Sequence, residues 1–332
     1  MKLLILGGTV FLGRHIVNAA LAAGHEVTTF NRGKHSLEEQ KSVEKLTGDR
    51  SEDLSALLKR KWDAVLDTCG YEPEVVAKSV NALKDSVEHY TFISSISTYK
   101  GFRTKGMDET AQVKSLEDGD EPEYGSLKVG CERTVEKVFG NKALIIRPGL
   151  IVGPFDPTDR FTYWPTRVSK GGQVAAPGDP DRNIQFIDVR DLAKWTIHLI
   201  EKKTSGVFNA TGPKEPLTMR AFLNECNSVS GNKAQFVWLT DEQVLEAGVG
   251  PWMEMPLWIP ASAEEHRYFQ NIDCTKAHRA GLTYLPLANT IKDTLEWDAS
   301  HASKIERKAG LAPEKEAKLL ASSDESTRMQ NR

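Results

Sequence analysis

A glycine-containing turn at the start of the chain is the feature that most constrains its fold. The short apolar run Leu3–Leu6 ends at Gly7-Gly8, and Leu12–Ala23 follows with apolar residues at helical spacing up to Gly24. The run predicts a buried strand, and the spacing predicts a helix that the glycine stops. A second strand is expected at Glu26–Phe30. Strand, helix and strand in this order begin a parallel sheet.

The alternation of strands and helices continues along the chain. Short apolar runs predict further strands at Ala64–Leu66, Tyr90–Ile93, Ala143–Ile146 and Gly206–Asn209. Amphipathic spacing predicts helices at Val75–Leu83, Tyr124–Val138 and Leu192–Ile200. This pattern indicates the α/β class: a Rossmann-like, doubly wound parallel sheet with a smaller C-terminal substrate-binding lobe.

Composition suggests how the chain divides. We expect residues 1–150 to form a dinucleotide-binding Rossmann domain, to which 183–210 returns. Residues 151–182 and 211–302 contain many Pro, Gly and aromatic residues, which is typical of loops around a pocket, and we expect them to form the substrate-binding lobe. Residues 303–332 are charged and Ala-rich, and we expect a tail that is partly disordered.

Charge and composition argue against several classes of protein. The net charge is −3, whereas a nucleic-acid-binding protein needs a basic excess. No run approaches the about 18 apolar residues of a membrane span, and the first apolar run is too short for a signal peptide. The four cysteines are scattered and the eight histidines lack metal-site spacing. We expect a cytoplasmic protein with a small-molecule substrate and no nucleic-acid partner, membrane or metal.

The turn from Gly7 to Gly13 is suited to bind a dinucleotide pyrophosphate. It lies between a strand and the N-terminus of a helix, where backbone N–H groups attract an anion and glycines allow it to approach. A phosphate loop of the NTPase kind is excluded because Arg14 and His15 stand where Lys and Ser or Thr are required. The simpler alternative is a tight turn without a ligand.

The end of the second expected strand bears on the choice of dinucleotide. NAD-binding proteins usually carry an acidic residue there, but this chain has Asn31-Arg32, with Lys34 nearby. Arginine pairs with a 2′-phosphate that an acidic side chain would repel. The sequence therefore favours NADP, with NAD possible if Arg32 is only a solvated turn residue.

Tyr124 and Lys128 form a Tyr-x-x-x-Lys pair on one face of an expected helix. A neighbouring ammonium favours the phenolate, so we expect Lys128 to lower the pKa of Tyr124 from about 10 toward neutrality. Tyr124 is then a candidate general acid and base, and Lys128 is placed to reach the nicotinamide ribose. Alone, the pair also fits an ordinary amphipathic helix.

The glycine turn, Ser94-Ser95 and the Tyr-x-x-x-Lys pair occur in a fixed order on the expected elements. In this respect the sequence resembles the extended short-chain dehydrogenases/reductases, the NAD-dependent epimerase/dehydratase family. Further agreement is found at Gly48-Asp49, Arg147-Pro148-Gly149, Gly153-Pro154 and residues 187–193. The resemblance covers most of residues 1–215, weakens to about 300 and is absent from the tail.

The resemblance implies roles for the matching residues. Ser95 orients a substrate carbonyl, Tyr124 transfers the proton, and Lys128 assists Tyr124. The implied cofactor contacts are Gly7, Gly8, Thr9, Val10, Phe11, Leu12, Gly13, Asn31, Arg32, Asp49, Arg50, Thr68, Cys69, Gly70, Ser94, Tyr124, Lys128, Pro148 and Gly149. Members of the family often form dimers, so a homodimer is expected by analogy.

Two departures from the family pattern affect the expected substrate. The turn has Val10 where the family has its middle glycine, and this form resembles an atypical branch that includes the chloroplast stem-loop-binding proteins. Sugar-nucleotide epimerases usually place Asn at Leu150 and Arg near Ile184, to hold a nucleotide diphosphate. The loss of both polar groups favours a less charged substrate, although Arg160 or Arg182 can substitute.

These observations leave three functions open. The first is an NAD(P)-dependent oxidoreductase that acts on a carbonyl or alcohol through Ser95, Tyr124 and Lys128. The second is a nucleotide-sugar epimerase or dehydratase that uses the same residues with a tightly bound cofactor. The third is a non-catalytic or RNA-associated Rossmann protein, which only the form of the glycine turn suggests.

Overall fold

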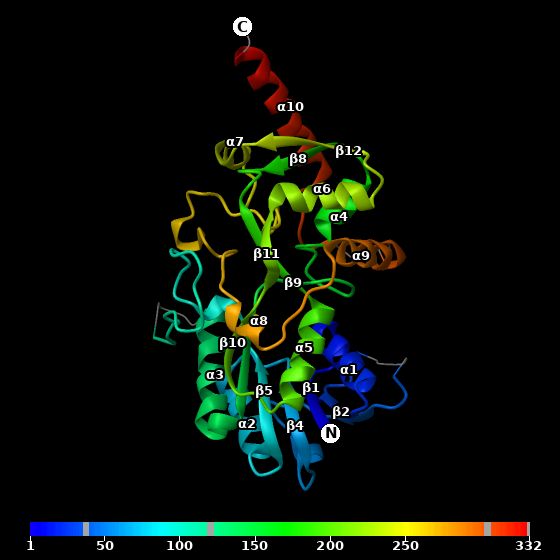
Figure 1. Ribbon diagram of the computed structural model, residues 1–332, viewed down its shortest axis with the longest axis vertical. Coiled ribbons are helices and arrows are strands. Elements are labelled where there is room, and N and C mark those ends of the chain that lie inside the picture. The colour runs from blue at the N-terminus through cyan, green and yellow to red at the C-terminus, as the bar shows by residue number, and fades with distance from the viewer. Residues whose placement is uncertain (36–39, 118–122, 302–306, 331–332) are drawn as a thin grey trace.

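A seven-stranded parallel sheet is the centre of the computed structural model, which describes residues 1–35, 40–117, 123–301 and 307–330 (Figure 1). The strand order is β10-β6-β5-β4-β1-β2-β3. The strands are β1 (Lys2–Leu6), β2 (Glu26–Asn31), β3 (Glu44–Thr47), β4 (Trp62–Asp67), β5 (Val87–Ile93), β6 (Ala143–Pro148) and β10 (Gly206–Ala210). The order reverses between β1 and β4, the switch point at which doubly wound sheets bind ligands. The predicted Rossmann-like fold is confirmed.

Strand β1 is buried on both faces, as a central parallel strand must be. Leu3, Leu4, Ile5 and Leu6 have no exposed surface. Leu3 and Ile5 belong to the core on one face of the sheet, whereas Leu4 and Leu6 belong to the core on the other. The alternation follows from the two-residue period of a strand, and it explains why the strand is apolar throughout.

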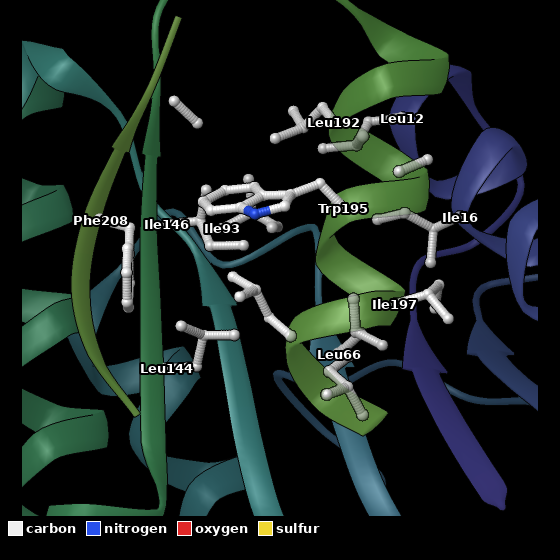
Figure 2. Packing of buried hydrophobic residues seen from close by; sticks show 14 of the residues in the cluster. Leu12, Ile16, Leu66, Ile93, Leu144, Ile146, Leu192, Trp195, Ile197 and Phe208 are labelled. Atoms are coloured by element: carbon white, nitrogen blue, oxygen red, sulfur yellow. The ribbon is translucent and has the colours of Figure 1, made fainter. Parts of the chain in front are cut away.

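Two pairs of helices cover the two faces of this sheet. Helices α1 (Phe11–Ala22) and α5 (Val189–Glu201) pack on one face, and α2 (Pro73–Leu83) and α3 (Tyr124–Phe139) pack on the other. In Figure 2 the indole of Trp195, on α5, points toward Ile146 and Phe208 of the sheet. Removing such large apolar side chains from water is the main force that holds α5 on the sheet.

A second group of elements lies beyond one end of the sheet (Figure 1). Its strands are β7 (Ile151–Val152), β8 (Gly172–Pro177), β9 (Asn183–Asp188), β11 (Gly212–Thr218) and β12 (Ala234–Leu239). Its helices are α4 (Tyr163–Ser169), α6 (Met219–Val229), α7 (Asp241–Glu246), α9 (Leu287–His301) and α10 (Pro313–Gln330). These elements share a separate core around Phe161, Trp164 and Phe222. We call this group the C-terminal lobe, and the domain boundaries expected from the sequence stay a prediction.

The chain passes between the two parts several times. After β6 it leaves the sheet for β7, α4, β8 and β9, returns along α5 to β10, and then leaves again into β11. Strand β10 pairs with β6 in parallel, from Gly206 opposite Leu144 to Ala210 opposite Pro148. The short helix α8 (Thr275–Arg279) then contacts β10. The sheet therefore contains both β6, the strand before this first departure from the sheet, and β10, the strand after it.

The end of the chain differs from the charged tail that we expected. Helix α10 buries Leu319 in the core of the C-terminal lobe. Glu316 pairs with Arg167 of α4 at 2.5 Å, and Lys315 pairs with Glu254 at 2.7 Å. The expectation of a tail is wrong for residues 307–321, because part of their charge is used in contacts with the lobe. Across the described ranges, no helix is both long and apolar enough to cross a membrane.

Candidate active site

A cleft of about 910 Å³ runs along the carboxyl ends of the sheet strands and reaches the C-terminal lobe. It is lined by all the residues that were expected to act in catalysis or to bind the cofactor, except Gly70: Gly7, Gly8, Thr9, Val10, Phe11, Leu12, Gly13, Asn31, Arg32, Asp49, Arg50, Thr68, Cys69, Ser94, Ser95, Tyr124, Lys128, Pro148 and Gly149. Trp252, which packs against the core of the C-terminal lobe, and Phe269, which packs against the core of the sheet, also line the cleft. The structure thus brings the predicted residues together, and their individual roles stay predictions.

The glycine turn presents backbone atoms to the cleft because its glycines have no side chains. Gly7 and Gly8 have φ values of +100° and +83°, which residues with a side chain rarely adopt. A Cβ atom on Gly13 would lie 2.7 Å from the backbone nitrogen of Gly8, so only glycine lets α1 start this close to the turn. The first N–H groups of α1 lack partners within the helix. The turn therefore has the features from which the sequence predicted a pyrophosphate site, and binding there stays a prediction.

Tyr124 is the first residue of α3, and half of its surface is exposed. Ser95 follows β5 and accepts a hydrogen bond from the backbone N–H of Ser97 at 3.1 Å. Burial raises the pKa of the Tyr124 phenol, and Tyr71 adds to this effect, whereas the Ser95 hydroxyl and the Arg160 guanidinium oppose it. The net shift is upward, so the predicted lowering of the Tyr124 pKa is wrong.

Lys128 is buried beneath Tyr124, and its ammonium faces backbone carbonyls. Its Nζ donates hydrogen bonds to the carbonyl oxygens of Gly70 at 2.7 Å and Ile93 at 2.9 Å. The centre of the Tyr124 ring lies 5.8 Å from Nζ. Burial lowers the pKa of Lys128. The two carbonyls hold the ammonium near the ring, and burial of the phenol is the largest cause of the raised pKa of Tyr124.

The ends of β2 and β3 form the other extremity of the cleft. Asn31 Oδ1 accepts from the backbone N–H of Gly33 at 2.8 Å, which shapes the turn that carries Arg32. Asp49 accepts from the Ser51 hydroxyl at 2.6 Å, and this bond, with help from the charges of Arg32 and Lys34, lowers the pKa of Asp49. Arg32 is exposed at the border of the cleft. A carboxylate and two cations therefore meet at this end.

Arg50 was expected to contact a cofactor, but its guanidinium turns away into the protein. It forms two hydrogen bonds of 2.7 Å with the carboxylate of Asp67 and one of 3.1 Å from Nε to the Ser79 hydroxyl. The hydroxyl of Tyr90 donates to the same carboxylate at 2.9 Å. The guanidinium of Arg50 is thus part of a buried network, and the contact of this cleft-lining residue with a cofactor stays a prediction.

Comparison with known proteins shows the family to which this chain belongs. The model of the NAD dependent epimerase/dehydratase family matches residues 3–211. This chain belongs to that family. It is 28% identical over 252 residues to the chloroplast stem-loop binding protein of 41 kDa b of Arabidopsis thaliana, covering 69% of this chain but only 63% of that relative. It is 22% identical over 253 residues to an epimerase family protein of Bos taurus, with 70% and 82% covered.

Solved structures of epimerases share the fold. UDP-glucuronic acid 4-epimerase from Bacillus cereus, in complex with NAD, has a TM-score of 0.66 at 18% identity, with 90% of this chain and 99% of that chain covered. A putative epimerase from Burkholderia cenocepacia has a TM-score of 0.67 at 20% identity, with 91% and 98% covered. At these identities the likeness shows the fold alone.

The substrate side of the cleft departs from the family pattern as the sequence indicated. Leu150 lines the cleft, and Ile184 is buried in the core of the C-terminal lobe. Arg182 donates to the backbone of Ile259 and pairs with Asp241 at 3.4 Å. Arg160 lines the cleft instead. Of the two arginines considered as substitutes for the family's polar groups, Arg160 is the one that borders the site.

Several lining residues were not predicted from the sequence. Tyr71 follows β4, and its ring centre lies 4.8 Å from Lys128 Nζ. Trp252 and Phe269 also line the cleft, and the sequence did not single them out. Both lie more than a hundred residues after Tyr124, and no local pattern links them to it. The Cys69 thiol also lines the cleft, but burial raises its pKa to about 11, so it is not a nucleophile at neutral pH.

Proposed function

We propose that the protein is an NAD(P)-dependent oxidoreductase that prefers NADP(H) and acts on a carbonyl or alcohol group of a small molecule. One observation carries this proposal: Ser95, Tyr124 and Lys128 border the same cleft as the glycine turn. Membership of the family supports it, and solved structures of this fold were obtained with NAD. The glycine turn would hold the pyrophosphate of the dinucleotide, and Tyr124 lies in the same cleft.

The side chains divide the work in the following way. When bound, the cofactor supplies or accepts the hydride. The Ser95 hydroxyl donates a hydrogen bond to the substrate oxygen, and Tyr124 gives that oxygen its proton during reduction. The raised pKa of Tyr124 keeps the phenol protonated at neutral pH, which is the form that reduction requires. Two of the three N–H donors of Lys128 bind carbonyls, which leaves one for a ribose hydroxyl.

The Tyr124→Phe variant tests this assignment. The phenol is half exposed, so its loss leaves the fold intact, and we expect turnover to fall by at least about a hundredfold while NADPH still binds. Tyr71→Phe is the matched control, because it removes another phenol from the same cleft. Unchanged turnover in Tyr124→Phe, measured as NADPH oxidation with a panel of aldehydes and ketones, would refute the mechanism.

The preference for NADP rests on Arg32 and Lys34 at the end of β2. A charge-assisted bond to a 2′-phosphate contributes about 1.5–3 kcal/mol. We therefore expect Arg32→Asp to weaken NADPH binding about 10- to 100-fold and to leave NADH binding nearly unchanged, measured by fluorescence titration. Arg133→Asp, an exposed change on α3 outside the cleft, is the control. Equal losses for both dinucleotides would contradict the preference.

A nucleotide-sugar epimerase is the second candidate. The shared fold favours it, since solved structures with that fold include enzymes named for UDP-glucuronic acid and UDP-glucose. Leu150, Ile184 and the paired Arg182 weaken it, because none of them offers a free polar group to a diphosphate. Thermal-shift measurements with UDP-, GDP- and dTDP-sugars, together with mass spectrometry for copurified NAD(P), separate the two candidates.

A further inference from the structure

Arg160 is a charged residue of the cleft to which the proposed function assigns no role. It lies between β7 and α4, on the side of the C-terminal lobe, and it lines the cleft together with Thr158. Its guanidinium carbon lies 5.6 Å from the centre of the Trp252 ring. The side chain is partly buried, and it acts electrostatically on Tyr124. It therefore belongs to the region where the substrate must lie.

The surroundings of Arg160 differ from those of other arginines with little exposed surface. Five of these form an ion pair with a carboxylate: Arg50 with Asp67, Arg147 with Glu132, Arg167 with Glu316, Arg182 with Asp241, and Arg190 with Asp188. For Arg160, the described residues provide neither an ion pair nor a hydrogen bond. Withdrawing a guanidinium from water without a partner is unfavourable, and an anionic ligand removes that penalty.

Asp156 is the acidic residue that attracts Arg160, but its geometry is not that of a partner. Its Oδ1 accepts hydrogen bonds from the backbone N–H of Thr158 at 2.8 Å and from the Thr158 hydroxyl at 2.7 Å. Its Oδ2 is buried and has no partner within the described ranges. The neighbouring Asp159 forms an ion pair of 2.7 Å with Arg307. Asp156 therefore keeps the guanidinium near this loop without occupying its hydrogen-bond donors.

We propose that Arg160 binds an anionic group of the substrate, so that the substrate class is a carbonyl compound or alcohol that also carries a carboxylate or a phosphate. This inference rests on the proposed function and specifies its substrate. A guanidinium forms two parallel hydrogen bonds with either anion, and the Trp252 ring below it favours the cation. Leu150 and Phe269 line the cleft as apolar walls, and the carbon frame of such a substrate would lie against them.

Pairs of compounds that differ only in charge test the inference. Succinic semialdehyde is compared with its methyl ester, and glyceraldehyde 3-phosphate with glyceraldehyde, so the two arms distinguish a carboxylate from a phosphate. We expect the wild-type protein to use the charged member of at least one pair better. Arg160→Met should lower kcat/KM for that member about 100-fold and change the uncharged member less than about threefold. Arg160→Lys should recover part of the loss.

The controls separate this inference from the proposed function. Arg267→Met removes an exposed arginine of the C-terminal lobe that does not line the cleft, and should change nothing. Two outcomes overturn the inference and leave the proposed function standing. One is turnover that depends on Tyr124 but shows no preference for the charged compound. The other is an equal loss of kcat/KM for the charged and the uncharged compound in Arg160→Met. If no compound is turned over, the proposed function fails, and calorimetry with the charged members decides the inference: binding that Arg160→Met abolishes supports it, and binding that is absent or unaltered overturns it.

Discussion

The ammonium of Lys128 lies 2.7 Å from the carbonyl oxygen of Gly70, so helix α3 is tied to the loop that follows β4. A second bond, of 2.9 Å, ties the same ammonium to Ile93 at the end of β5. The residue that we expect to contact the ribose therefore also fixes the relative positions of three elements around the cleft. Its replacement should affect both stability and binding.

Lys128→Met should destabilise the protein by about 1–3 kcal/mol, because two buried carbonyls lose their charged donor. It should also weaken NADPH binding. Urea unfolding and fluorescence titration measure the two effects. Lys137→Met, an exposed change near the end of the same helix, should leave both nearly unaltered. A Lys128→Met protein of wild-type stability would mean that the two carbonyl bonds contribute little.

Gly13→Ala should loosen the start of α1. The added methyl group would lie 2.7 Å from the Gly8 nitrogen and 2.8 Å from its Cα, so the helix or the turn has to move. We expect a loss of about 1–3 kcal/mol in stability and a larger loss of dinucleotide affinity. Ala22→Ser, at the exposed end of the same helix, is the control. Thermal unfolding with and without NADPH is the measurement, and an undiminished shift by NADPH contradicts the role of the turn.

Asp67→Asn should be strongly destabilising at neutral pH, by about 3–5 kcal/mol, because it leaves the buried Arg50 without its counter-charge. Burial opposes ionisation of Asp67, but the Arg50 guanidinium outweighs it and lowers the pKa. A depressed folded pKa means that the stabilisation is present above the unfolded value of about 3.9 and is lost as pH falls below it. The difference between wild type and variant, from urea unfolding, should stay constant from pH 8 to 5 and shrink below pH 4.

Asp156→Asn should have the opposite effect. Burial raises the pKa of Asp156 to about 6, so the charged form weakens the folded state as pH rises from about 4 to 6. Asparagine keeps the oxygen that binds Thr158, and we expect it to stabilise the protein by roughly 1–3 kcal/mol at pH 8 and not at pH 4. Asp108 binds Thr110 in the same way but is exposed, with a lowered pKa, so Asp108→Asn should not stabilise. A gain at both pH values would show that charge is not the cause.

The elements with a buried face were the ones that the sequence predicted well. The helix expected at Leu12–Ala23 is Phe11–Ala22, and the strand expected at Glu26–Phe30 is Glu26–Asn31. Strand β3 escaped the apolar pattern because it is an edge strand whose Glu44 and Lys45 are exposed. A strand without a buried face leaves no apolar period to detect.

The same limit applies to the site. Motifs that lie close together along the chain, such as Tyr124 with Lys128, were found by spacing. Trp252 and Arg160 reach the cleft through tertiary packing, which no local spacing records. The inward turn of Arg50, which follows β3, depends on Asp67 of β4, a strand that two others separate from β3, and no local pattern in the sequence indicates it. Residue types and spacing suggested which side chains take part in the proposed chemistry. The direction in which each side chain points could be known only from the folded structure.

The pairing of β10 with β6 has a consequence for any shortened form of the protein. Residues 149–205 leave the sheet from one of these strands and come back to the other, so this excursion is anchored at both ends. A chain cut before Gly206 would remove β10 from one side of β6 and expose a row of unsatisfied amide and carbonyl groups on that edge. Such an edge recruits strands from other molecules, so truncation there would yield aggregates in place of a minimal dinucleotide-binding unit.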